Sequence, residues 1–385
     1  MKPRSSARLS GSIAMPDGSL LRGHLNFTDR ITSLDPDTHV GNDYILPGFI
    51  DLQVNGSHGI DVMTAAPESL LTLARNLARE GTTAWLPTAV TAPIEKIARV
   101  HRNIASAMET SSHDSADTAP DYSAILGMHL EGPFISPLRL GAHPPLNLDP
   151  RGEPFDTVLA MDALRLITLA PELPGALEAM TRLTARGVIV SIGHTNATLD
   201  EANAGIAAGA RMFTHLFNAM RPLNHRDPGV IAAALAPSRA FAAIIPDGVH
   251  VHPSIVNLAY RARGRDGMIL VTDKVVLAGT AANGDVTVGR APATIREGAV
   301  RLANGTLAGS IISMLDAVRM MVEKTDAGIA DAAVMASTNP AILLNTSDRG
   351  RLQPNTRADL VVLSPNLELK SVIIGGREIA RIASP

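Results

Sequence analysis

The sequence predicts an α/β protein built mainly as a (β/α)8 barrel of the TIM type, and two observations lead to this fold class. Eight apolar stretches of strand length recur along the 385 residues, and stretches with helical spacing separate most of them. Nearly every apolar stretch also breaks into polar residues at its C-terminal end, where such a barrel builds its active site. A doubly wound open sheet also explains the alternation, but it does not call for polar residues at so many strand ends.

The expected strands are short and mostly apolar, as strands covered by helices on both faces are. In chain order they read ILPGFIDLQVN, TTAWLPTAV, AILGMHLEGP, LRLITLAPE, VIVSIGHT, RMFTHLFNA, AFAAIIPDGVH and MILVTDK. Helical spacing lies between them in stretches such as PESLLTLARNLARE, ELPGALEAMTRLTARG and TLDEANAGIAAGA. The polar residues that close the strands are therefore expected at one mouth of the barrel: Gln53, Asn55, His129, Glu131, Glu172, His194, His215, His250 and Asp273.

The two ends of the chain differ from its middle. Residues 1–45 show short alternating runs around a PDG turn, and residues 350–385 show the same pattern around GG. Together they predict one small β-sandwich assembled from both termini, which leaves residues 46–349 for the barrel. A β excursion is expected near residues 282–306, and the polar, turn-rich residues 111–121 are expected to form a loop.

Composition argues against several classes of partner. A net charge of -3, with only three Tyr, one Trp and seven Phe, argues against nucleic acid. No apolar run reaches spanning length, and the N-terminal stretch MKPRSSARLSGSIAMPDGSL has no continuous apolar segment, which argues against a membrane. Since the chain has no Cys, any metal must be held by His, Asp or Glu, and a cytoplasmic location is expected.

Three residues have the chemistry of a metal site. Glu131 ends the third expected strand, while His194 and His215 end two consecutive later strands. A carboxylate and two imidazoles suit Zn²⁺ or Fe²⁺ and leave positions open for water and substrate. Each His taken alone is more often a hydrogen-bonded residue at a strand end, but the three together favour a metal. His129, two residues before Glu131, is either a fourth ligand or a buried structural residue.

Asp273, at the end of MILVTDK, is the candidate acid and base. An attacking water needs a nearby carboxylate that takes its proton and passes that proton to a leaving amine. The alternative roles are a helix N-cap or a salt bridge to the adjacent Lys274. Together with the three candidate ligands, Asp273 indicates a hydrolase with one metal.

The chain resembles the amidohydrolase superfamily along nearly its whole length, and within it the deacetylases of N-acetylated amino-sugar phosphates. The resemblance rests on motifs in a matching order and at matching intervals: PGFIDLQVNG, GMHLEGPFIS, GAH at 141–143, TLAPE, SIGHT, THLFNAM, RDPG, DGVH, LVTD, GTLAGS, STNPA and RADLVVL. It implies metal-dependent hydrolysis of the acetamide of N-acetylglucosamine 6-phosphate to glucosamine 6-phosphate and acetate. The galactosamine epimer is a close variant of this substrate.

The resemblance also implies a role for each matching residue. The metal ligands are expected to be Glu131, His194 and His215, with Asp273 as the proton carrier and His143 polarising the acetamide carbonyl. For His143 the alternative is a loop residue without a task. Contacts to the sugar phosphate are expected from Asn218, Ala219, Arg226 and His250. The arginine is expected to reach in from the neighbouring subunit, which implies a homodimer.

The resemblance gives a meaning to Gln53 and Asn55. Most superfamily members carry His-x-His at these positions, where it binds a second metal that is often bridged by a carboxylated Lys on the fourth strand. Here both residues are neutral amides, and the fourth strand ends in TLAPE without a Lys. Amides are weak ligands for a transition metal, although they hydrogen-bond well. We therefore predict one divalent metal per subunit, Zn²⁺ in the first place, with Fe²⁺ and Mn²⁺ as alternatives, and vestigial second-metal positions.

Some residues depart from the expected pattern. Lys274 stands where a small residue is usual; an inward-pointing cation would lower the pKa of Asp273, and we expect the side chain to point outward. His225 and His252 are neighbours of the expected phosphate ligands and could share or replace their roles.

Two other functions stay open at this level. One is a cyclic amidase of the dihydroorotase or hydantoinase kind, which the missing second-metal ligands disfavour. The other is a non-catalytic relative that binds a metal or a sugar phosphate but has lost turnover.

Overall fold

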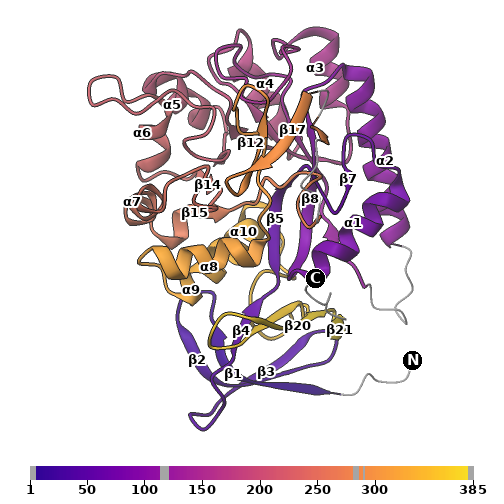
Figure 1. Ribbon diagram of the computed structural model, residues 1–385, viewed down its shortest axis with the longest axis vertical. Coiled ribbons are helices and arrows are strands. Elements are labelled where there is room, and N and C mark those ends of the chain that lie inside the picture. Colours follow the sequence, from indigo (N-terminus) through magenta and orange to yellow (C-terminus); the bar gives the residue numbers. More distant parts are fainter. Residues whose placement is uncertain (1–5, 113–120, 281–285, 289–290, 380–385) are drawn as a thin grey trace.

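Eight parallel strands form a barrel in the computed structural model of this protein, which describes residues 6–112, 121–280, 286–288 and 291–379 (Figure 1). Each strand pairs with the next one along the chain. The strands are β5 (Phe49–Val54), β8 (Thr82–Val90), β10 (Met128–Glu131), β11 (Leu164–Leu169), β12 (Ile189–Ile192), β13 (Met212–Phe213), β14 (Phe241–Ile244) and β15 (Met268–Leu270), with the short β9 (Ala124–Ile125) beside β8. All eight lie in the stretches that were expected to be strands, so the predicted barrel is confirmed.

The barrel closes where β5 meets the residues that follow β15. Val54 and Lys274 form an isolated parallel bridge there. Across this seam the N–H of Asp273 donates to the carbonyl of Gln53 at 2.9 Å, and the N–H of Asn55 donates to the carbonyl of Lys274 at 2.9 Å. Since these are main-chain bonds, closure brings polar residues from the first and the last barrel strand together.

Helices surround the barrel (Figure 1). They are α1 (Pro67–Arg79), α2 (Ile94–Ser112), α3 (Gly152–Leu159), α4 (Ala176–Ala185), α5 (Leu199–Ala207), α6 (Gly229–Leu235), α7 (Pro253–Arg263) and α8 (Met314–Lys324), with a 3-10 turn, η1 (Arg265–Gly267), before β15. In α1 the apolar residues Leu70, Leu73 and Leu77 recur at helical spacing and are buried. A capping box between Thr198 and Glu201 starts α5.

The interior of the barrel has an apolar body and a polar end. Leu52, Leu86 and Leu166 belong to an apolar cluster that also contains Leu344. Leu344 follows the segment formed by α9 (Ile329–Ala333), η2 (Val334–Thr338) and α10 (Asn339–Leu343). At the C-terminal ends of the strands the buried side chains are polar instead: Gln53, Thr88, His129, Glu131, Thr168, Ser191 and Thr214. Apolar packing therefore fills the body of the barrel, and the buried polar side chains gather at the C-terminal ends of its strands.

A second sheet combines the two ends of the chain below the barrel in the view of Figure 1. Its strands are ordered β21–β20–β19–β4–β1–β2–β3. They are β1 (Ala7–Ala14), β2 (Leu20–Phe27), β3 (Ile31–Pro36), β4 (Tyr44–Pro47), β19 (Leu360–Leu363), β20 (Leu369–Ile374) and β21 (Arg377–Ile379). The ends join where β4 and β19 pair antiparallel, with Leu46 opposite Val361. One small β unit from both termini was predicted; its limits at residues 45 and 350 stay a prediction.

Two smaller sheets complete the described chain. β16 (Val286–Val288), β17 (Ala291–Arg296) and β18 (Ala299–Leu302) form an antiparallel sheet in the region expected to be a β excursion. β6 (Gly56–Ser57) pairs with β7 (Ile60–Asp61). Of the expected loop at 111–121, residues 113–120 lie outside the described residues.

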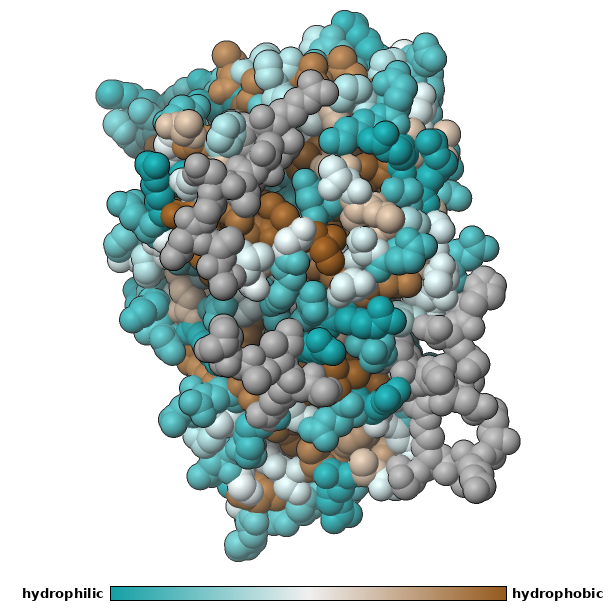
Figure 2. Space-filling view, turned by 45° about the vertical axis from the view of Figure 1, so that its right-hand side comes forward, coloured by the Kyte–Doolittle hydropathy of each residue, from teal (hydrophilic) through white to brown (hydrophobic). Residues whose placement is uncertain are grey.

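Hydrophilic residues cover most of the face shown in Figure 2, with hydrophobic ones between them. Among the described residues, no helix is long and apolar enough to cross a membrane.

Asp51 is buried at the barrel seam. Its Oδ2 accepts a hydrogen bond from the hydroxyl of Thr272 at 2.6 Å, and its Oδ1 accepts from the N–H groups of Gln53 and Thr272 at 3.2 and 3.3 Å. Burial raises the pKa of Asp51 from its ordinary value near 3.8 to about 6, although these hydrogen bonds oppose the shift. The folded protein therefore binds a proton at Asp51 more tightly than the unfolded chain does.

Asp51→Asn should change how stability depends on pH. In the wild type, the stability that this bound proton contributes is fully present below about pH 4 and is lost as the pH rises through about 6. The variant has no proton to lose at this position. Between pH 4 and a pH above 6, the free energy of unfolding of the wild type should therefore fall relative to that of the variant by on the order of 3 kcal/mol. Denaturant unfolding of both proteins from pH 4 to 8 measures this difference, and two parallel pH profiles would contradict it.

Candidate active site

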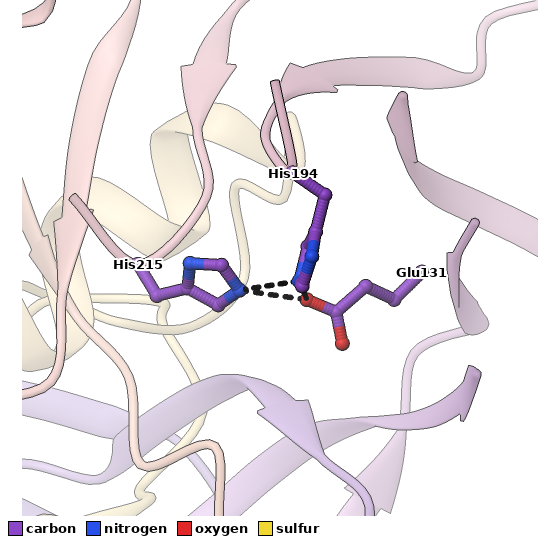
Figure 3. A group of neighbouring side chains, drawn as sticks. All are labelled: Glu131, His194 and His215. Carbon is purple, nitrogen blue, oxygen red and sulfur yellow. Dashed lines mark hydrogen bonds and ion pairs between the residues drawn. The ribbon is translucent and has the colours of Figure 1, made fainter. Parts of the chain in front are cut away.

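Glu131, His194 and His215 converge on one point at the C-terminal end of the barrel (Figure 3). Oε1 of Glu131 lies 3.1 Å from Nε2 of His194 and 2.8 Å from Nε2 of His215, and the two nitrogens lie 3.1 Å apart. All three side chains are buried. They come from the end of β10 and from the residues just after β12 and β13, so the barrel brings together the three residues expected to hold a metal.

This arrangement fits a cation. Nδ1 of His194 lies 2.9 Å from the carbonyl oxygen of Arg139, which can only accept, so Nδ1 carries the proton and Nε2 of the neutral ring presents a lone pair. Lone pairs of the carboxylate face the same point. Ligand atoms in a tetrahedral site with bonds of about 2.0–2.1 Å lie roughly 3.4 Å apart, close to the separations here. The donor set therefore suits one divalent cation.

The electrostatics of the group favour positive charge at its centre. Burial alone would raise the pKa of Glu131, but the neighbouring imidazoles of His143, His194 and His215 hold it well below its usual range. Burial would lower the pKa of His215, yet its hydrogen bond to Glu131 raises it. Burial and the neighbouring His143 lower the pKa of His194 to about 4. Glu131 is thus an anion against which one positive charge is stabilised, whether a proton or a metal ion.

The strand ends are conformationally strained where these side chains emerge. His194, His215 and Asp273 have φ values of 48°, 28° and 49°, in the left-handed region that residues other than glycine rarely adopt. Neighbouring hydrogen bonds hold the first of these turns, because Glu172 accepts from the hydroxyl of Thr195 at 2.5 Å and from a backbone N–H at 2.6 Å. Glu172, which was expected at the mouth of the barrel, therefore supports the turn after β12.

Gln53 and Asn55 contact carboxylates. Nε2 of Gln53 donates to Oε1 of Glu131 at 3.0 Å, and Nδ2 of Asn55 donates to Oδ1 of Asp273 at 2.6 Å. The two amide oxygens, like Nδ1 of His215, are buried and have no hydrogen-bond partner among the described residues. Both residues thus use their donors toward the two carboxylates expected to do the chemistry.

Asp273 is a carboxylate with raised proton affinity. Burial and the nearby charge of Glu131 raise its pKa to about 6, against the opposing effects of His215, His250 and the hydrogen bond from Asn55. Its main chain is fixed on both sides, since its N–H donates to Gln53 and its carbonyl accepts from the N–H of Ser310 at 3.0 Å.

Lys274 does not interact with Asp273 in the way its sequence position suggests. Its ammonium group forms an ion pair with Glu80 at 2.5 Å, and its side chain is only 2% exposed. The expectation that it points outward therefore needs a correction, because the side chain is buried in the protein rather than turned to solvent. A salt bridge between Asp273 and Lys274, considered from the sequence, is replaced by this pair with Glu80, since a buried cation needs a close counter-charge.

The two other histidines near the group differ in their surroundings. His129 is fully buried, with Nδ1 3.0 Å from the carbonyl of Leu52 and Nε2 2.8 Å from the hydroxyl of Thr168. Both ring nitrogens are thereby occupied, so His129 is the structural residue and not a fourth ligand. In His143, Nδ1 lies 2.7 Å from the hydroxyl of Thr91, whereas Nε2 is 3.6 Å from Oε2 of Glu131.

The residues expected to contact a phosphate are only partly brought together. His250 lies in the segment after β14, at the same end of the barrel as Asp273, which follows β15. Asn218 and Ala219 lie in the turn after His215, where the side chain of Asn218 donates to the carbonyl of His215 at 3.2 Å.

Arg226 is different, because it lies exposed on a turn before α6, and no described side chain pairs with its guanidinium group. His225 is also exposed, and His252 caps α7 by accepting from the N–H of Ser254 at 3.2 Å.

Asp247 is a residue of the mouth that the sequence reading missed. Its Oδ2 lies 2.5 Å from Nδ1 of His250, and its Oδ1 accepts from the N–H groups of Val249 and His250 at 2.8 and 2.7 Å. Burial would raise the pKa of Asp247, but these hydrogen bonds from His250 and Val249 lower it. The signal was present in the sequence PDGVH, where an Asp stands three residues before a His across a turn.

Comparison with known proteins gives a consistent picture. Residues 44–379 match the model of the amidohydrolase family. The chain is 37% identical to an N-acetylglucosamine-6-phosphate deacetylase of Lysinibacillus sphaericus, over 87% of this chain and 85% of that protein. It is 38% identical to an N-acetylgalactosamine-6-phosphate deacetylase of Escherichia coli O157:H7, over 86% of this chain and 87% of that protein.

Solved structures agree with these sequence matches. The N-acetylglucosamine-6-phosphate deacetylase of Thermotoga maritima has a TM-score of 0.90 at 29% identity, covering 98% of this chain and 100% of that one. An aspartate-to-alanine variant of the Mycobacterium smegmatis enzyme, in complex with N-acetylglucosamine 6-phosphate, has a TM-score of 0.88 at 32% identity, again over 98% and 100% of the two chains.

Proposed function

We propose that this chain, which belongs to the amidohydrolase family, hydrolyses the acetamide of an N-acetylated amino-sugar 6-phosphate, with N-acetylglucosamine 6-phosphate as the first candidate. The observation that supports this most is the meeting of two unlike carboxylates at one mouth of the barrel. Glu131 is an anion among imidazoles, whereas Asp273 has a pKa of about 6, raised by burial and by Glu131. A ligand and a proton carrier are what amide hydrolysis at a metal site requires.

We propose one divalent cation per chain, Zn²⁺ before Fe²⁺ or Mn²⁺, held by Glu131, His194 and His215. Such a cation would polarise the acetamide carbonyl and lower the pKa of a water molecule. The chain's own residues do the remaining work. His143, which faces Glu131 through Nε2, is suited to donate a hydrogen bond to the carbonyl oxygen of the acetamide.

Asp273 is suited to move the proton. Burial raises the pKa of its carboxyl group, so the carboxylate accepts a proton from water more readily than an exposed one does. The protonated form can then give that proton to the departing amine of the sugar. One group thus serves both halves of the reaction, which a carboxylate of ordinary pKa does less well.

We assign the sugar phosphate to the mouth around His250, with Asn218 and Ala219 on the adjoining turn. The carboxylate of Asp247 holds His250 with its Nδ1 toward Asp247, so that Nε2 is available to a ligand. A phosphate dianion bound there would form a charge-assisted hydrogen bond with the imidazole.

We further propose a homodimer, as the family resemblance implies, and in support of it the guanidinium group of Arg226 is exposed and pairs with no described side chain. In this proposal its guanidinium group binds the phosphate held by the neighbouring subunit. A cytoplasmic location also stays a prediction.

Other functions are weaker. The galactosamine epimer is a second candidate substrate, since the relative from Escherichia coli O157:H7 is as similar to this chain as the glucosamine-type relative. A cyclic amidase with two metals is disfavoured, because Gln53 and Asn55 donate hydrogen bonds to carboxylates and supply no imidazole for a second metal. Loss of turnover through Lys274 is disfavoured because that cation is paired with Glu80.

The first experiment measures acetate release by the purified protein from both epimers, with metal per subunit counted on the same sample. Release from one epimer with about one metal bound is expected. Metal binding without release from either sugar would contradict the proposed reaction. Two metals per subunit would contradict the assignment of Gln53 and Asn55.

Asp273→Asn should leave metal content and substrate binding nearly intact while lowering kcat by roughly 100-fold or more, because only proton transfer is lost. Steady-state kinetics on protein of known metal content measure this. A variant that keeps near-normal kcat would remove Asp273 from the mechanism.

Arg226→Ala should raise KM for the phosphorylated sugar by about 10-fold or more, because a charge-assisted contact to the phosphate is lost. Turnover of unphosphorylated N-acetylglucosamine should change much less. Arg186→Ala, at the exposed C-terminal end of α4, is the control for removing a surface charge. Equal losses on both sugars would place Arg226 away from the phosphate.

A further inference from the structure

Two amide side chains at the end of β5 each contact a different carboxylate of the candidate active site. Gln53 donates to Glu131 at 3.0 Å, and Asn55, two residues later, donates to Asp273 at 2.6 Å. Glu131 is an expected metal ligand, whereas Asp273 is the expected proton carrier. One short segment therefore contacts both the expected metal ligand and the expected proton carrier.

The orientation of the two amides follows from chemistry. An ionised carboxylate only accepts hydrogen bonds, so the nitrogen of each amide must face it. The amide oxygens are left buried without a partner among the described residues.

Asn55 is the group that fixes the carboxylate of Asp273. The main chain of Asp273 is held by Gln53 and Ser310, but this leaves the carboxylate free to rotate. Among the described hydrogen bonds, the one from Asn55 is the only bond to that carboxylate, and it engages Oδ1. With Oδ1 occupied, Oδ2 is the oxygen left to accept and return a proton.

Gln53 has the corresponding place beside Glu131. It is fully buried and donates to Oε1, the same oxygen that faces both imidazole nitrogens. A hydrogen bond to the oxygen that faces the expected cation orients the ligand, as outer partners of metal ligands do. In this respect Gln53 acts on the ligand set, and Asn55 acts on the proton carrier.

We propose that Asn55 and Gln53 are positioning residues with separate tasks: Asn55 holds Asp273 so that one oxygen transfers the proton, and Gln53 holds Glu131 toward the cation. The part concerning Asn55 rests on the proposed function, whereas the part concerning Gln53 requires only that the site binds a metal. Replacing either amide by leucine removes the donor at little change of side-chain size.

The first measurement needs no substrate. Zn²⁺ affinity of the wild type, Gln53→Leu and Asn55→Leu is determined by competition with a chelating indicator. Loss of an outer hydrogen bond to a ligand typically weakens metal binding about 10- to 100-fold, which is expected for Gln53→Leu, whereas Asn55→Leu should change affinity less than about 3-fold. Equal effects of the two variants would overturn the separation of tasks.

The second measurement follows acetate release at saturating Zn²⁺. Asn55→Leu should lower kcat by about 10- to 100-fold with little change in KM, because proton transfer and not binding is impaired. The same replacement in the Asp273→Asn background should have no further effect, since Asn55 acts only through Asp273. A merely structural role would lower the rate in both backgrounds, which would overturn the proposal.

Controls separate these outcomes from misfolding and from failure of the proposed reaction. If Asn55→Leu does not fold, Asn55→Ala gives the same comparison without added bulk. A wild type that releases acetate from neither sugar would refute the proposed function and, with it, the task of Asn55. The Zn²⁺ titration still decides the task of Gln53 in that case, because unchanged affinity in Gln53→Leu would refute it independently.

Discussion

Closure of the barrel between β5 and the end of β15 is the constraint on which the rest of the mouth depends. The residues that meet there are 218 positions apart in the chain, yet Asn55 and Asp273 make a hydrogen bond of 2.6 Å. Two main-chain bonds across the seam, each 2.9 Å long, fix the distance between the two backbones. The side chains at this seam therefore start from positions that the barrel sets, and short polar residues are long enough to reach one another. Without closure, neither Asn55 nor Gln53 would have a carboxylate to contact.

The second constraint is charge balance in a buried space. Glu131 is almost fully buried with its carboxylate among three imidazoles, and an isolated anion at such a place is costly. The neighbouring imidazoles lower the pKa of Glu131 in spite of burial, so positive charge is stabilised at the centre of the group. The same anion raises the pKa of Asp273, together with burial. A metal ligand and a proton carrier are thus coupled, because the charge at Glu131, and any cation that Glu131 holds, acts directly on Asp273.

The sequence predicted the barrel because its strands are apolar runs with polar ends, and this pattern is local. It also predicted that Glu131, His194 and His215 meet, since the ends of parallel strands lie at one mouth. It did not predict the pair of Lys274 with Glu80. Asp273, just before Lys274, has a positive φ, so the side chains that follow it no longer alternate between the two faces as they do in a strand. The dyad of Asp247 and His250 was missed although it lies within four residues, because its contact depends on how the turn folds.

The identity of residues 53 and 55 decides what Asp273 is able to do. Imidazoles at these two positions would supply ligands for a second cation next to the Asp273 carboxylate. A cation at that distance would favour the ionised carboxylate and lower its pKa, which makes it a weaker base. Neutral amides add no charge, and their single hydrogen bond to Asp273 lowers its pKa less than burial and Glu131 raise it. The amides at the end of β5 therefore hold the Asp273 carboxylate in place without adding to the positive charge that a single cation on Glu131, His194 and His215 would already bring near it.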